Sequence, residues 1–75
     1  MIYATMCIGN KWLNKYRDTI NVFSSKNHLE ILTDTPSGLT GSHITLYERN
    51  IFSYYEKINF IFNLFKKYNQ RITYI

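Results

Sequence analysis

The side chains of this sequence that could do nucleophilic or metal chemistry are one cysteine, Cys7, and two histidines, His28 and His43. An imidazole can deprotonate a nearby thiol, and the thiolate is then a nucleophile or a metal ligand. Cys7 lies in an apolar stretch, however, where a cysteine more often behaves as a small buried hydrophobe with a raised pKa. Each histidine begins an expected strand and the two could be neighbours, but two histidines without a third ligand make no closed zinc site. The sequence therefore predicts neither a catalytic residue nor a metal site.

Acidic side chains and glycines give no further reactive group. Residues 38–42 contain two glycines but are not a phosphate-binding loop, because no lysine follows and they do not open a helix after a strand. The acids fall on different expected elements, and no two of them form a pair. The five are Asp18, Glu30, Asp34, Glu48 and Glu56.

The first half of the chain predicts a strand, a helix and a second strand. Residues 2–8 form an apolar run ended by Gly9, which is typical of a strand buried on both faces. Asn10 stands where a helix N-cap is expected, and a polar break follows at residues 24–27 before a strand over residues 28–33. The helix between them is predicted by apolar residues at helical spacing, which are Trp12, Leu13, Tyr16, Ile20 and Phe23.

The second half predicts a strand, a helix and a strand. Residues 43–47 alternate as a short, less buried third strand, and residues 71–75 form a final one. Residues 51–68 give the strongest helical pattern, with Lys66 and Lys67 in the last turn, where cations suit the helix dipole. The apolar face of this helix is expected to centre on Ile51, Tyr55, Ile58, Phe62 and Phe65.

The element order β-α-β-β-α-β predicts one small α/β domain over residues 1–75, with a mainly parallel, Rossmann-like sheet and flanking helices. In a doubly wound sheet the last strand lies beside the first, on the side away from the second, and a ligand crevice opens at the carboxyl ends of those two strands. Those ends are residues 7–9 and Ile75. The alternative is a ferredoxin-like α+β fold, in which a middle hairpin makes the sheet antiparallel and no such crevice forms.

Composition narrows the function classes. A hydrophobic fraction of 45% and an aromatic fraction of 17% exclude a disordered segment. The net charge of +4 is spread thinly, with one doublet at Lys66-Lys67, so nucleic acid is a disfavoured partner. No apolar run approaches the ~20 residues that cross a bilayer, and no basic segment precedes the apolar N-terminus, so we expect no membrane span and a cytoplasmic location.

Several segments together resemble a known enzyme family. Residues 3–9, a helix with Trp12-Leu13 near its start, and residues 29–34 resemble the opening of nucleotide-sugar-dependent glycosyltransferases of the GT-A fold. Residues 52–57 and 71–75 are similar to the helix and strand that lead, in that family, to an Asp-x-Asp metal-binding motif. The resemblance covers nearly all 75 residues, and the sequence ends where that motif would begin.

The resemblance implies binding roles for five residues. Ala4, Thr5 and Met6 at the end of the first strand would offer backbone groups to the nucleoside base. Asp34 would lie near the base or ribose, and Lys57 would face the diphosphate or brace the acidic motif. The implied ligands are a nucleoside diphosphate sugar and a divalent cation bridging its phosphates. Because the carboxylate pair that holds this cation is missing, the implied function is a nucleotide-sugar-binding half-domain that is inactive alone.

A second hypothesis is a small non-enzymatic interaction protein, such as a mobile-element or virus-encoded inhibitor or a subunit of a larger complex. A truncated doubly wound sheet leaves its last strand bare on one edge and one face of the long helix uncovered, and such surfaces mark partner sites. A protein partner or a second copy of the chain would then bind at strand 71–75 and helix 51–68. Phe52, Phe60 and Phe62 are candidate contact residues, although core packing is their commoner role.

Overall fold

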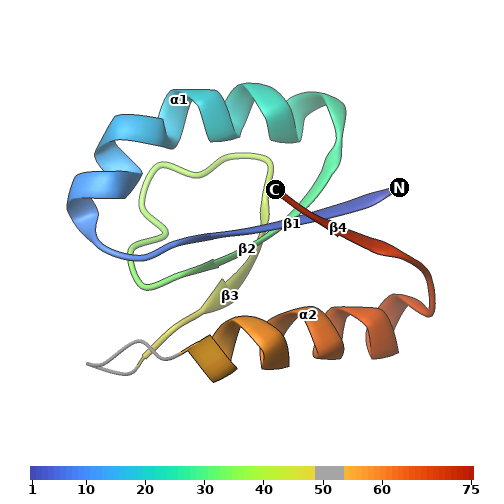
Figure 1. The fold of residues 1–75 in the computed structure, drawn as a ribbon. Helices are drawn as coiled ribbons and strands as arrows, with labels where there is room; N and C mark the ends of the chain where they lie inside the picture. The colour runs from blue at the N-terminus through green and yellow to red at the C-terminus, as the bar shows by residue number, and fades with distance from the viewer. Residues whose placement is uncertain (49–53) are drawn as a thin grey trace.

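Four parallel strands form one sheet in the computed structural model, which describes residues 1–48 and 54–75. The strands stand in the order β3-β2-β1-β4, with α1 on one face of the sheet and α2 on the other (Figure 1). The α/β prediction with flanking helices is confirmed. The ferredoxin-like alternative is wrong, because β2 and β3 pair in parallel instead of forming a hairpin. The elements are β1 (Ile2–Cys7), α1 (Asn10–Lys26), β2 (His28–Thr33), β3 (His43–Leu46), α2 (Tyr54–Tyr68) and β4 (Ile72–Tyr74).

The first strand lies at the centre of the sheet. Its residue Ile2 stands beside His28 of β2 on one side and beside Ile72 of β4 on the other. The predicted position of the last strand, beside the first and away from the second, is therefore confirmed. Because all strands are parallel, their carboxyl ends share one edge of the sheet and their amino ends share the opposite edge.

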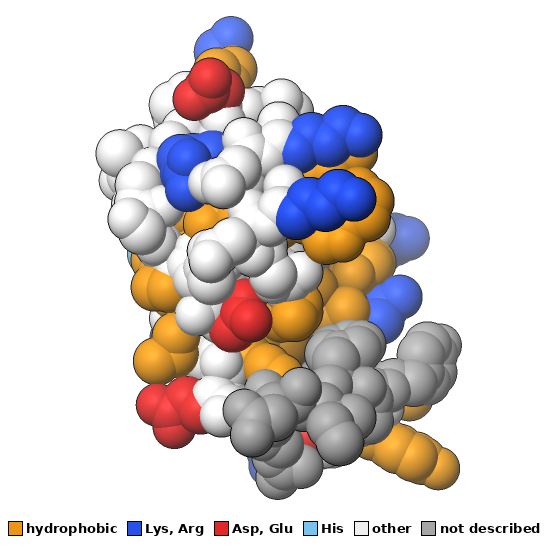
Figure 2. Space-filling view, turned by 90° about the vertical axis from the view of Figure 1, so that its left-hand side faces the viewer, with side chains coloured by type: hydrophobic (Ala, Val, Ile, Leu, Met, Phe, Trp, Pro, Cys, Tyr) orange, Lys and Arg blue, Asp and Glu red, His pale blue; other side chains and the backbone are white. Residues whose placement is uncertain are grey.

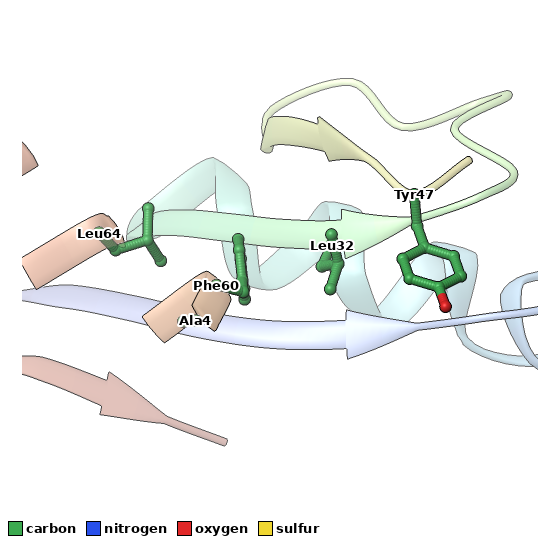
Figure 3. Close-up of a cluster of buried hydrophobic side chains, with 5 residues drawn as sticks. All are labelled: Ala4, Leu32, Tyr47, Phe60 and Leu64. Carbon is green, nitrogen blue, oxygen red and sulfur yellow. The ribbon is translucent and has the colours of Figure 1, made fainter. Parts of the chain in front are cut away.

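Alternation along the strands divides the core into two clusters. Leu32 of β2 packs on the α2 side with Ala4, Tyr47, Phe60 and Leu64 (Figure 3). Its neighbour Ile31 belongs to a smaller cluster on the α1 side, with Cys7 and Leu13. Successive side chains of a strand point to opposite faces, so a strand with apolar residues at both kinds of position can hold two helix layers at once.

The packing face of α2 differs from the prediction. Phe60 and Leu64 are buried against the sheet, whereas Ile58, Phe62 and Phe65 are among its exposed residues. The prediction that the apolar face centres on residues 55, 58, 62 and 65 is therefore wrong, and its residues Ile51 and Phe52 lie outside the described part of the chain. The apolar side of this helix is wide enough to include both Phe60 and Phe62, so the sequence pattern does not specify which part of it packs.

The first helix keeps part of its predicted face and differs at its ends. Leu13 and Ile20 pack in the cluster on the α1 side, and the ring of Phe23 contacts that of Tyr3. Trp12 and Tyr16 stack on one another with their ring centroids 6.2 Å apart, and both are exposed. Asn10 is not the N-cap: the helix begins at Asn10 and its cap is Gly9. The predicted break at residues 24–27 begins late, since α1 continues to Lys26. The hydroxyl groups of Ser24 and Ser25 donate to the carbonyls of Asn21 and Val22, which lets both serines remain helical.

Strand lengths and exposure follow the sequence closely. The second strand has its predicted bounds, while β1, β3 and β4 each lack one or two of their predicted end residues. All four residues of β3 are exposed, as expected for a less buried third strand. Of the two helices in the described part of the chain, neither is long and apolar enough to cross a membrane.

Candidate functional site

A sharp turn joins the carboxyl end of β1 to α1. Gly9 has φ 98° and ψ 142°, a backbone conformation that residues with a Cβ atom rarely adopt. Its amide donates a hydrogen bond to Oδ1 of Asp34 at 2.9 Å, and its carbonyl accepts one from the amide of Leu13 at 3.1 Å. Asp34 directly follows β2, so one carboxylate ties the end of that strand to the start of α1. A negative charge there also complements the helix dipole.

The carboxyl end of β4 meets the middle of β1. The amide of Ile75 donates to the carbonyl of Ala4 at 2.9 Å, and the hydroxyl of Thr5 donates to the carbonyl of Ile75 at 3.0 Å. Ala4 is fully buried. The backbone carbonyl of Ala4, which the resemblance assigned to the nucleoside base, is thus engaged in extending the sheet, and the Thr5 side chain secures the end of β4.

Lys57 lies beside the same strand end. Its ammonium nitrogen is 4.1 Å from the centroid of the Tyr74 ring, within the range of a cation–π contact. Burial raises the pKa of the Tyr74 hydroxyl, so this ring stays neutral. Met6 packs against the core cluster on the α2 side. The structure therefore gathers Ala4, Thr5 and Lys57 around the end of β4, places Asp34 at the Gly9 turn, and puts Met6 in the core.

The surface at this edge carries charges of both signs. Figure 2 views the end of the molecule where β1 runs into α1, and acidic and basic side chains are interspersed over the described part of that face. Lys57 can attract an anionic group and Asp34 can accept hydrogen bonds from a hydroxyl or an amide. Among the described residues of this edge, Lys57 and Asp34 offer a charge and hydrogen-bond acceptors for a ligand, and they do not pair a nucleophile with a general base.

We expect the cysteine at the end of β1 to be unreactive. Cys7 is buried, and both this burial and the nearby Asp34 carboxylate raise the pKa of its thiol. We therefore expect Cys7 to react with iodoacetamide at pH 8 at least about 10-fold more slowly in the folded chain than in urea, because the raised pKa keeps it protonated. The measurement is the rate of mass increase. Equal rates in the two conditions would contradict the assigned burial.

A second group of polar side chains lies at the amino edge of the sheet. Glu30 is paired directly with His43 of the neighbouring strand, and His28 lies two residues earlier on the same face of β2. Nε2 of His28 is 2.5 Å from Oε2 of Glu30, and Nδ1 of His43 is 3.9 Å from that oxygen. The two imidazole rings stack with centroids 4.3 Å apart. The hydroxyl of Tyr68, at the end of α2, donates to Oε2 of Glu30 at 2.9 Å.

Sequence reasoning found two members of this group and missed the third. The prediction that His28 and His43 could be neighbours is confirmed. No third ligand was predicted beside them, and the structure places a carboxylate oxygen of Glu30 within 4.8 Å of a ring nitrogen of each histidine. The available signal was His28-x-Glu30, since alternate residues of a strand share a face. To predict that His43 lies beside Glu30, one must know the register between β2 and β3, and the sequence does not determine that register.

The described residues thus contain two candidate sites, one at each edge of the sheet. The carboxyl edge presents Lys57 and Asp34, and the amino edge presents the His28–Glu30–His43 cluster. Comparison with protein-family models gave no match, and comparisons with curated proteins and with solved structures gave none either.

Proposed function

We propose that the chain is a nucleotide-sugar-binding half-domain of the glycosyltransferase type, with its ligand at the carboxyl edge between β1 and β4. The observation that carries this proposal is the position of β4, parallel to β1 and on its side away from β2. The helix α1 leaves β1 on one face of the sheet, and α2, which leads into β4, lies on the other face (Figure 1). Ligands of open parallel sheets bind at such points, where the connections diverge.

Lys57 and Asp34 at this edge would bind different parts of the nucleotide. Lys57 would offset the charge of the diphosphate, and Asp34 would accept hydrogen bonds from the ribose or base while it holds the Gly9 amide. Transfer of the sugar also needs a divalent cation held by carboxylates close to the phosphates. Within residues 1–48 and 54–75, the group of three possible metal ligands lies at the other edge of the sheet. The proposal is therefore one of binding and not of transfer.

The test is thermal unfolding of the 75-residue chain with UDP or GDP in the presence of magnesium chloride. A ligand at 100 times its dissociation constant stabilises the folded state by about 2.7 kcal/mol. In a chain of this size each kcal/mol raises the melting temperature by roughly 4–8 °C. We expect one of the two nucleotides to raise the melting temperature, and Lys57→Ala to remove most of that rise.

Lys26→Ala is the matched control for this experiment. Lys26 is an exposed lysine at the last turn of α1, at the amino edge of the sheet, so its loss removes the same charge far from the proposed site. The control should keep the full nucleotide effect. If neither nucleotide changes the melting temperature, or if the two variants lose the effect equally, the nucleotide proposal is wrong.

A second candidate function, an interaction protein, is favoured by the surface beside β4. The described sheet ends at this strand, and next to it lies an almost wholly apolar hollow of about 590 Å³. Ile58, Phe62 and Phe65 of α2 line it together with Ile72. An exposed edge strand flanked by apolar side chains suits pairing with a second copy of the chain. Sedimentation equilibrium of the same samples separates the two candidates, since a monomer that is stabilised by nucleotide excludes the second.

A further inference from the structure

We propose that His28, Glu30 and His43 form a binding site for a transition-metal ion of the zinc class at the amino edge of the sheet. The three donor atoms lie within 4.8 Å of one another. They come from two adjacent strands, and Tyr68 at the end of α2 contacts both Glu30 and His28. The site is independent of the nucleotide proposal, which concerns the opposite edge.

The donor atoms need only small movements to surround an ion. Donor atoms about 2.0–2.2 Å from a tetrahedral zinc ion stand about 3.3–3.6 Å apart. Oε2 of Glu30 is 2.5 Å from Nε2 of His28 and 3.9 Å from Nδ1 of His43. The first distance is shorter than a zinc site requires and the second is longer, so the donor atoms need to move only slightly. The His43 side chain is 59% exposed, which leaves it room to turn. The ion would replace the hydrogen bond between His28 and Glu30.

Glu30 is the most firmly held of the three ligands. Its side chain is only 3% exposed, and a buried carboxylate is costly unless cations or hydrogen-bond donors compensate its charge. The Tyr68 hydroxyl orients it, as the partners of metal-binding carboxylates commonly do. The rings of His28 and Tyr68 pack at nearly a right angle, with their centroids 5.2 Å apart. Two of the three ligands are therefore held in place before an ion binds.

The donor set selects the class of ion. Imidazole nitrogens suit zinc, copper and nickel, whereas magnesium and calcium take oxygen ligands almost exclusively. Three protein ligands leave a fourth position for water. Glu30 also lines a hollow of about 440 Å³ between β2, β3 and α2, which gives that position access to solvent. Because all residues of β3 are exposed, an ion shared by His43 and Glu30 would tie this edge strand to the body of the sheet.

The experiment is a titration of the 75-residue chain with zinc chloride, free of nucleotide, followed by calorimetry and by the NMR signals of the two histidine rings. We expect one ion per chain and a shift of both ring signals at the same stoichiometry. His43→Ala and Glu30→Gln should each lower the association constant more than about 100-fold, and Tyr68→Phe by about 10-fold. Asp18→Asn, which removes an exposed carboxylate from α1, should leave the affinity unchanged.

Circular dichroism of each variant establishes that it is folded before its affinity is compared. If His43→Ala is unfolded, His43→Gln replaces it, since its amide keeps a polar group at this exposed position. Absence of saturable binding by the folded chain would overturn the proposal. Equal affinities of the wild-type chain and the folded His43 variant would overturn it as well, because the ion would then be held elsewhere. Neither result bears on nucleotide binding, which is measured with magnesium at the other edge.

Discussion

Replacing Phe60 by alanine is expected to remove a large part of the free energy of unfolding of the chain. Phe60 is 5% exposed and packs with Leu64 of α2 against Ala4 and Leu32 of the sheet (Figure 3). Truncation of a buried phenylalanine typically costs about 3–5 kcal/mol. A chain of this size has a total stability of about 4–11 kcal/mol. The substitution therefore removes a large part of what keeps α2 on the sheet.

Urea unfolding followed by circular dichroism measures this effect, and Phe62→Ala is its matched control. Phe62 is the same residue type in the same helix but is 58% exposed. Its truncation should cost less than about 1 kcal/mol, as substitutions at surface positions usually do. A larger loss of stability in the Phe62 variant than in the Phe60 variant would mean that α2 packs through the opposite face.

The orientation of α2 decides which residues are available for contacts. With Phe60 and Leu64 inward, the exposed side presents Ile58, Phe62 and Phe65 next to β4. Of the three candidate contact residues from the sequence, Phe62 is on this surface, Phe60 is in the core, and Phe52 lies outside the described residues. The surface that the interaction hypothesis needs is therefore real, but it is composed differently from the prediction.

The fold was predictable because its signals are local. Gly9 ends β1, a polar segment precedes His28, and apolar runs of strand length alternate with helical periodicity. A strand that returns after a helical crossover is almost always parallel to the first, which fixed the relation of β1 and β2. The sequence predicted the packing faces of the helices less well. In α2 the aromatic and aliphatic residues cover a wide arc that includes both Phe60 and Phe62, so only tertiary contacts decide that Phe60 and not Phe62 is buried.

The two candidate sites differ in how much of each could be predicted from the sequence. Asp34 follows β2 directly, and its place near the end of β1 is a consequence of two parallel strands ending at one edge. The amino-edge cluster depends on a register, in which Glu30 faces His43. A shift of one residue would turn His43 to the other face of the sheet and leave Glu30 without it. Short apolar strands do not specify such a register locally, which is why the sequence did not place Glu30 beside the two histidines.

The second large effect is expected from Leu13→Ala, in the first turns of α1. Leu13 is fully buried against Cys7 and Ile31, and its amide is bonded to the carbonyl of Gly9. Truncation of a buried leucine costs about 2–5 kcal/mol, according to how far the surroundings collapse into the space. Trp12→Ala is the control, because Trp12 is larger but 50% exposed and should cost less than about 1 kcal/mol.

The Leu13→Ala substitution should also change the reactivity of Cys7 at the end of β1. Leu13 covers Cys7 on the α1 side of the sheet, so its truncation opens a path to the thiol and lowers the burial that raises the pKa of Cys7. We expect faster alkylation of Cys7 by iodoacetamide in the Leu13 variant than in the Trp12 variant, under conditions in which both remain folded. Equal alkylation rates would show that α1 does not protect the end of β1. The Gly9 turn would then have to be held by Asp34 without help from the helix.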